Sequence, residues 1–128
     1  MDRDRYKDLY YKIDVYKNYI YCVRRTCTGT VCCYIDVAQD PRFNNNEVKN
    51  LKFSQIEELV DLHGGCTYAG LGFPIYAVGQ KGFLADDLII GYDYGHFDDI
   101  DMTSSTMRSK ISEAEAERAL YAIIDSLV

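Results

Sequence analysis

The chain contains no uncharged stretch long enough to cross a membrane. A transmembrane helix needs about 20 consecutive apolar residues, whereas the longest uncharged run here is shorter and is interrupted by glycine and proline. The charged residues 1–5 are followed by no apolar signal core and no lipidation motif. We therefore expect no membrane contact and a location in the cytoplasm in which the chain is made.

Tryptophan is also absent, but 12 tyrosines and an apolar content of 48% give the composition of a folded protein. A length of 128 residues is enough for one core, so we expect a single domain over residues 1–128. The five cysteines are odd in number and have no secretion signal, which argues against a disulfide framework. Their spacing does not resemble a zinc site. We expect reduced core thiols, of which only Cys66 lies close to a candidate site.

Basic residues are missing from one long segment, between Lys81 and Arg108. The same segment contains six aspartates: Asp86, Asp87, Asp93, Asp98, Asp99 and Asp101. Its negative potential disfavours phosphate and direct nucleic-acid binding. A phosphate-bearing ligand would need positive charge from elsewhere in the chain or from a neighbour in a homodimer. The candidates for that charge are Lys17, Arg24, Arg25 and Arg42.

The apolar pattern predicts an α+β fold. Apolar residues at helical spacing from Tyr6 to Tyr16 predict an N-terminal amphipathic helix. Residues 1–18 would then be a helical extension of a core that covers residues 19–128. Around Thr28 and Gly29, two β-branched and cysteine-rich segments predict a β-hairpin of residues 19–26 and 30–37.

Later strands at residues 66–69, 75–78 and 88–94 would complete an antiparallel sheet. Ser112 and Glu115 form a capping-box pattern before the clearest amphipathic stripe, which predicts a C-terminal helix packed on the sheet.

The first of the two capping-box patterns along the chain, which precedes that of Ser112, predicts a short helix between the hairpin and the later strands. Ser54 and Glu57 would begin this helix, which we expect to run to about Leu62. Gly64 or Gly65 would end it.

Both histidines of the chain lie in glycine-flanked segments. His63 precedes Gly64 and Gly65 at the end of the predicted short helix, and His96 follows Gly95 at the end of an apolar strand. Glycine at such positions permits positive φ and the close approach of a ligand or another backbone. The two segments suggest one shared site. An equally open interpretation is that both histidines only form hydrogen bonds that fix their turns.

Three kinds of chemistry are open for a shared site. The imidazoles of His63 and His96 with the carboxylate of Asp98 could bind a divalent metal, although their spacing is not diagnostic. His96 could act as a general base that is oriented by Asp93 or Asp98. Glycine amides and tyrosine rings could instead hold a small planar ligand. The ligand-binding candidates are His63, Gly64, Gly65, Thr67, Tyr68, Tyr92, Asp93, Gly95 and His96. No cofactor is expected.

The two histidine segments follow the patterns HGGxTY and GxDxGHxxD. The matching residues are His63, Gly64, Gly65, Thr67 and Tyr68, followed by Gly91, Tyr92, Asp93, Gly95, His96 and Asp99. In this order, and after a hairpin, the patterns resemble those of a family of small uncharacterised bacteriophage and prophage proteins. The resemblance covers the chain from Tyr19 onward. It departs at residues 88–90, where the family often has paired tryptophans.

This resemblance implies a phage accessory protein in the bacterial host cytoplasm. By analogy with other small phage proteins, the leading hypothesis is a non-enzymatic counter-defence binder. It would inhibit a host defence component, either by sequestering a nucleotide-derived signal or by presenting its acidic surface to a basic partner protein. The alternative is a small hydrolase or phosphodiesterase with His96 as base, Asp93 or Asp99 as its orienting partner and His63 as a second base.

Overall fold

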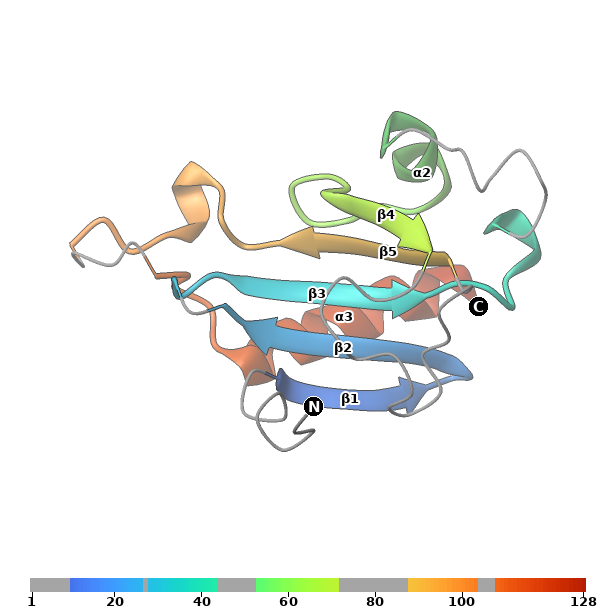
Figure 1. Ribbon diagram of the computed structural model, residues 1–128, viewed down its shortest axis with the longest axis horizontal. Helices are drawn as coiled ribbons and strands as arrows, with labels where there is room; N and C mark the ends of the chain where they lie inside the picture. Colours follow the sequence, from blue (N-terminus) through green and yellow to red (C-terminus); the bar gives the residue numbers. More distant parts are fainter. Residues whose placement is uncertain (1–9, 27, 44–52, 72–87, 104–107) are drawn as a thin grey trace.

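The computed structural model describes residues 10–26, 28–43, 53–71, 88–103 and 108–128. Within them, five strands form an antiparallel sheet in the order β1-β2-β3-β5-β4 (Figure 1). The strands are β1 (Tyr10–Tyr16), β2 (Tyr19–Arg25), β3 (Val31–Asp36), β4 (Tyr68–Leu71) and β5 (Leu88–Asp93). The helices are the 3₁₀ turns η1 (Pro41–Phe43) and η3 (Phe97–Asp99) and the α-helices α2 (Phe53–Leu59) and α3 (Glu113–Leu127). The predicted α+β fold is confirmed.

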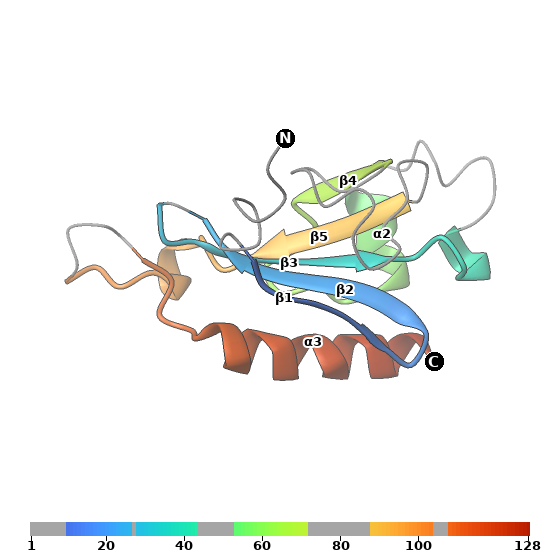
Figure 2. The same cartoon turned by 60° about the horizontal axis from the view of Figure 1, so that its bottom comes forward.

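The core lies between one face of the sheet and the two α-helices, with α3 running along that face (Figure 2). Because side chains alternate along a strand, Val31, Cys33 and Ile35 of β3 point to this core, whereas Cys32 and Tyr34 point to the opposite face. Helix α3 contributes one buried stripe, formed by Ala116, Leu120, Ile124 and Leu127. The helix-facing layer therefore holds most of the buried apolar side chains that the structure describes.

The predicted N-terminal helix is wrong for residues 10–16, which form the edge strand β1; residues 1–9 lie outside the described part. Strand β1 joins β2 through a two-residue turn in which Lys17 and Asn18 have φ values of 48° and 70°. Two successive positive φ values are typical of the type I′ turn, whose twist matches a β-hairpin. The β-branched residues Ile13 and Val15 alternate with Lys12 and Asp14 as in a strand, and pairing with β2 forms that strand.

The hairpin and the C-terminal helix agree with the sequence. Strands β2 and β3 pair from Tyr21 opposite Ile35 to Arg25 opposite Val31. At the start of α3, the Glu115 backbone N–H donates to Ser112 Oγ over 3.1 Å, and the Ser112 N–H donates to the Glu115 carboxylate. The second capping box is therefore present.

The first capping box is not present, because α2 already includes Phe53 and Ser54 lies inside it. Helix α2 also ends at Leu59, before Leu62. The Glu57 carboxylate accepts the Cys66 N–H over 2.8 Å, so it holds the chain that follows the helix. The glycine pair therefore shapes a separate turn after the helix.

Four cysteines that the structure describes, Cys22, Cys32, Cys33 and Cys66, are free and buried, as expected for core thiols. Cys27 lies outside the described residues, as do the predicted strand at 75–78 and the turn that follows it. In the part of the chain that is described, no helix has the length and apolar character needed to span a membrane.

Candidate functional site

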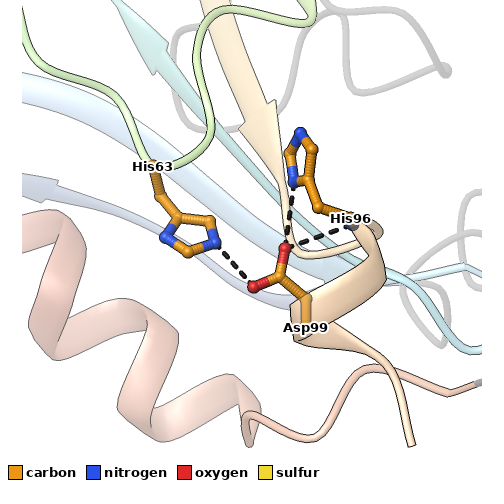
Figure 3. Close-up of side chains that lie close together, drawn as sticks. All are labelled: His63, His96 and Asp99. Carbon is orange, nitrogen blue, oxygen red and sulfur yellow. Dashed lines mark hydrogen bonds and ion pairs between the residues drawn. The ribbon is translucent and has the colours of Figure 1, made fainter. Parts of the chain in front are cut away.

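The two histidine segments meet in space, and a single carboxylate connects them (Figure 3). His63 Nε2 lies 2.8 Å from Asp99 Oδ1, and His96 Nδ1 lies 2.9 Å from Asp99 Oδ2. The two imidazole rings have their centroids 6.0 Å apart. We call these three residues the His–Asp–His cluster.

His63 is positioned by the turn that follows α2. Leu62 is buried in the core, and the Gly65 N–H donates to the Leu62 carbonyl over 2.9 Å, which closes the turn around His63 and Gly64. Gly64 and Gly65 both have positive φ, at 67° and 94°, a conformation that only glycine adopts readily. A Cβ atom on Gly64 would overlap the His96 imidazole. Glycine at position 64 therefore permits the close approach of the two segments.

His96 is positioned by the chain between β5 and η3. The Gly95 N–H donates to Asp93 Oδ1 over 2.9 Å, and the Asp99 N–H donates to the His96 carbonyl over 2.8 Å. The Asp99 carboxylate also accepts the His96 backbone N–H, at 3.2 Å. Asp99 thus closes its own 3₁₀ turn and connects this turn to His63.

The hydrogen bonds define which imidazole nitrogens remain available. Since an ionised carboxylate only accepts hydrogen bonds, His63 donates from Nε2 and His96 donates from Nδ1. His63 Nδ1 and His96 Nε2 then keep their lone pairs and make no hydrogen bond to any residue that the structure describes. The side chains are 40% exposed for His63 and 41% for His96, so both nitrogens can meet a ligand.

Asp99 is the most buried member of the cluster, with a side chain that is 11% exposed. Burial alone would raise its pKa. The hydrogen bonds from His63 and His96 outweigh burial and lower the pKa of Asp99 below the ordinary value of 3.8. Asp99 is therefore ionised near neutral pH.

A metal ion is sterically compatible with the cluster. One ligand atom from each of His63, His96 and Asp99 lies within 4.8 Å of the others. The sequence-based metal set contained Asp98 in place of Asp99; Asp98 is exposed, while Asp99 holds both imidazoles. The Asp99 carboxylate already forms a hydrogen bond with each imidazole. A metal ion would have to replace these two hydrogen bonds.

The predicted tyrosines do not line the cluster together. Tyr92 is only 1% exposed and lies in the core, and Tyr68 belongs to the opposite face of the sheet, where it packs edge-on against Tyr34 at 5.6 Å. The aromatic neighbour of the cluster is Tyr94, whose ring stacks on His63 at 4.2 Å with an interplanar angle of 23°. Of the three tyrosines considered for a planar ligand, Tyr68 and Tyr92 lie on opposite faces of the sheet, and Tyr94 lies at the cluster.

The other residues considered for the site lie in different environments. Asp93 Oδ1 lies 3.9 Å from His96 Nδ1, too far for a hydrogen bond, so Asp99 and not Asp93 orients His96. Thr67 is exposed, and its N–H donates to the Gly91 carbonyl over 2.9 Å. Burial raises the pKa of the Cys66 thiol, which donates to the Tyr68 carbonyl and is not a reactive thiolate.

The sequence reasoning missed Phe97, which is 75% exposed in the first position of η3. Asp98 beside it is also exposed, and Met102 is 55% exposed. We call Phe97, Asp98, Met102 and the half-buried Asp101 the Phe97 surface. The aspartates that follow Phe97 are the nearest sequence feature, but they do not distinguish an exposed from a buried phenylalanine.

The chain that leads into α3 forms hydrogen bonds with the segment that carries the Phe97 surface. The Lys110 N–H donates to the Asp99 carbonyl over 2.8 Å, and the Ser109 hydroxyl donates to the Tyr94 carbonyl over 2.7 Å. Ile100 forms a β-bridge with Ser109. Lys110 Nζ, 3.3 Å from the Asp98 carbonyl, offsets part of the negative charge.

The basic residues considered for a phosphate ligand already have partners. Lys17 pairs with Asp125 at 2.6 Å, and Arg42 pairs with Asp40 at 2.8 Å. Arg25 binds Glu113 and also donates to the carbonyls of Gly29 and Ile111. Arg24 lies over the Tyr34 ring, on the sheet face opposite the helices.

The resemblance of the two histidine motifs to a phage protein family stays a prediction. Comparisons with models of protein families, with curated proteins and with solved structures gave no match.

Proposed function

We propose that this protein is a non-enzymatic binder that inhibits a basic partner protein through the Phe97 surface. The observation that carries the proposal is the 75% exposure of Phe97 on a short turn bordered by the exposed carboxylate of Asp98. Aromatic residues, phenylalanine among them, are enriched at protein interfaces relative to the rest of the protein surface. Surrounding negative charge selects a positively charged partner and accelerates its association.

The His–Asp–His cluster supports this function as a rigid anchor. Phe97 and Asp98 lie between His96 and Asp99, so the hydrogen bonds of Asp99 to both histidines fix the turn that carries them. A preorganised turn loses less conformational entropy when a partner binds. In this interpretation the histidines need not contact the partner.

A phosphate-bearing signal fits the site less well than a basic protein. The neighbouring side chains are carboxylates, and Lys17, Arg25 and Arg42 are already paired elsewhere. A nucleotide would therefore meet negative charge that Lys110 offsets only in part. The counter-defence setting is a proposal that follows from the resemblance of the histidine motifs; a nucleic-acid-binding defence protein is the partner class with the required basic surface.

Site-specific photo-crosslinking tests the proposal. A benzophenone amino acid replaces Phe97 in one variant and Phe53, which is 46% exposed on α2, in a matched control. Both variants are irradiated in bacterial cells that express the chain. We expect one basic protein to be crosslinked from position 97 and not from position 53, with a yield that falls as salt rises. Equal crosslinking from both positions, or none from position 97, would contradict the proposal.

One observation favours a second candidate, the hydrolase. Asp99 orients His96 through Nδ1, and Nε2 makes no hydrogen bond to any described residue in a side chain that is 41% exposed, which is the arrangement of a carboxylate-oriented general base. Bis(4-nitrophenyl) phosphate and 4-nitrophenyl acetate serve as probes, each with and without Zn²⁺ or Mn²⁺. Nitrophenol release that is lost in His96→Gln would support the enzyme, and no release under any of these conditions would remove it.

A further inference from the structure

Strand β1 forms one edge of the sheet and, in the part of the chain that is described, pairs with another strand on one side only (Figure 1). Its exposed apolar side chains include Tyr11 and Val15, which are 46% and 51% exposed. An open edge with exposed apolar side chains is a template for pairing with another strand. The sequence of β1 indicates which strand that is.

The sequence Tyr-Tyr-Lys-Ile-Asp-Val-Tyr of β1 is complementary to itself when it is read in the opposite direction. If a second copy pairs antiparallel with Ile13 opposite Ile13, then Lys12 lies opposite Asp14. Twofold symmetry makes this charged pair occur twice. Cross-strand pairs of opposite charge and of apolar side chains both stabilise sheets.

The backbone of β1 has the orientation that this register needs. In a hairpin with a two-residue type I′ turn, the residues that flank the turn, here Tyr16 and Tyr19, exchange backbone hydrogen bonds. Since alternate residues point to opposite sides of the strand, the backbone groups of Ile13 and Val15 point away from β2. The Val15 N–H accordingly donates to the side chain of Asp14, at 2.8 Å. Outward groups at 13 and 15 are those that an Ile13-centred antiparallel pair would use.

The charged side chains of β1 lie on the face that carries α3. Lys12 Nζ is 3.1 Å from Glu117 on α3, and 40% of the Lys12 side chain remains exposed. Asp14 forms no ion pair with any of the residues described. A β-bulge lies between Tyr10 and Lys12, so the regular part of β1 begins at Lys12 and includes the whole Lys12–Asp14 segment. The Asp14 carboxylate is therefore available for an ion pair with Lys12 of a second copy.

We propose that two copies of the chain pair symmetrically through β1, centred on Ile13, to form one continuous antiparallel sheet. Lys12 of each copy pairs with Asp14 of the other. Both α3 helices then lie on the same face of the joined sheet, because residues directly opposite each other in an antiparallel pair have side chains on the same face. The interface is isologous and closes, so it produces a dimer and not a fibre.

Two charge reversals test the register. Asp14→Lys places two ammonium groups opposite each other at both symmetric positions, and Lys12→Asp places two carboxylates opposite each other. We expect light scattering after size exclusion to give a dimer for the wild type and a monomer for each variant. An equimolar mixture of the two variants should recover a dimer of one chain of each, because every cross-strand pair is then again of opposite charge. A monomeric wild type, a dimeric Asp14→Lys or a mixture that stays monomeric would overturn the proposal.

Controls separate this interface from folding and from a general effect of the change in charge. Glu58→Lys makes the same charge change at an exposed position of α2 and should leave the dimer intact. Since Lys12 also pairs with Glu117, circular dichroism must show that Lys12→Asp is folded. If it is not, Ile13→Pro replaces it: proline is tolerated in an edge strand where the N–H points outward, and it should give a folded monomer. A folded dimeric Ile13→Pro would also overturn the proposal.

Discussion

His63 and His96 come from segments more than thirty positions apart in the sequence, yet they bind opposite oxygens of one carboxylate, that of Asp99, at 2.8 and 2.9 Å. The same carboxylate accepts the backbone N–H of His96. Asp99 therefore connects the turn after α2 with the turn after β5. This arrangement gives the histidines a structural role, and it leaves one nitrogen of each ring without a hydrogen bond to any described residue.

Replacement of Asp99 should weaken the fold more than replacement of its neighbour. Asp99→Asn keeps the size of the side chain, but its amide nitrogen cannot accept a hydrogen bond from an imidazole. Hydrogen bonds to charged groups contribute about 1.5 to 3 kcal/mol, so we expect a loss of that order in the free energy of unfolding, measured by urea denaturation. Asp98→Asn is the matched control and should change it by less than about 0.5 kcal/mol. Equal losses in both variants would contradict the anchoring role.

The contribution of Asp99 should depend on pH. Its pKa is lower in the folded chain than the ordinary value of 3.8, because His63 and His96 donate hydrogen bonds to the ionised form. The stabilisation is therefore complete above the unfolded-state pKa and is lost as the pH falls below it, through the lowered pKa of the folded state. We expect urea midpoints of wild type and Asp99→Asn to differ at about pH 6 and to converge in strong acid. A difference that stays constant down to acid pH would contradict this.

Gly64→Ala tests the contact between the two segments. The φ of 67° is strained for alanine, and the new Cβ would displace the His96 imidazole. A non-glycine residue in this conformation costs about 1 to 3 kcal/mol. We expect lower stability and shifted NMR signals of the His96 ring. In the comparison variant Gly95→Ala, φ is not positive and the nearest atoms lie at 3.1 and 3.2 Å, so the loss should be smaller.

The sequence predicted the parts of the fold that depend on local signals. The hairpin of β2 and β3 has turn residues that are typical of a hairpin. Helix α3 begins at a capping box, which is typical of a helix start. The spacing of Tyr10, Ile13 and Tyr16 fits a helix, and pairing with β2 instead makes this segment a strand with Ile13 and Tyr16 on opposite faces. The glycine-flanked sequence patterns suggest that His63 and His96 share one site. They could not select Asp99 over Asp98, because that choice depends on how η3 turns.

The Phe97 surface could not be read from the sequence for a related reason. Phenylalanine is more often buried than exposed, so Phe97 passed as an ordinary apolar residue at the end of a strand. Its exposure results from the turn that Asp99 closes. Whether a single side chain is exposed depends on tertiary contacts, which a local sequence pattern does not specify.

The most direct test of the binding function is the affinity of the crosslinked partner for two variants in which a phenylalanine is replaced by alanine. Phe97→Ala should unfold at the same urea concentration as the wild type, because the side chain is 75% exposed, but should bind the purified partner at least about 30-fold more weakly, as expected for a hot-spot loss of about 2 kcal/mol. Phe53→Ala, the matched exposed phenylalanine, should bind as tightly as the wild type. If Phe97→Ala retains wild-type affinity, the Phe97 surface is not the binding site and the proposed function is wrong.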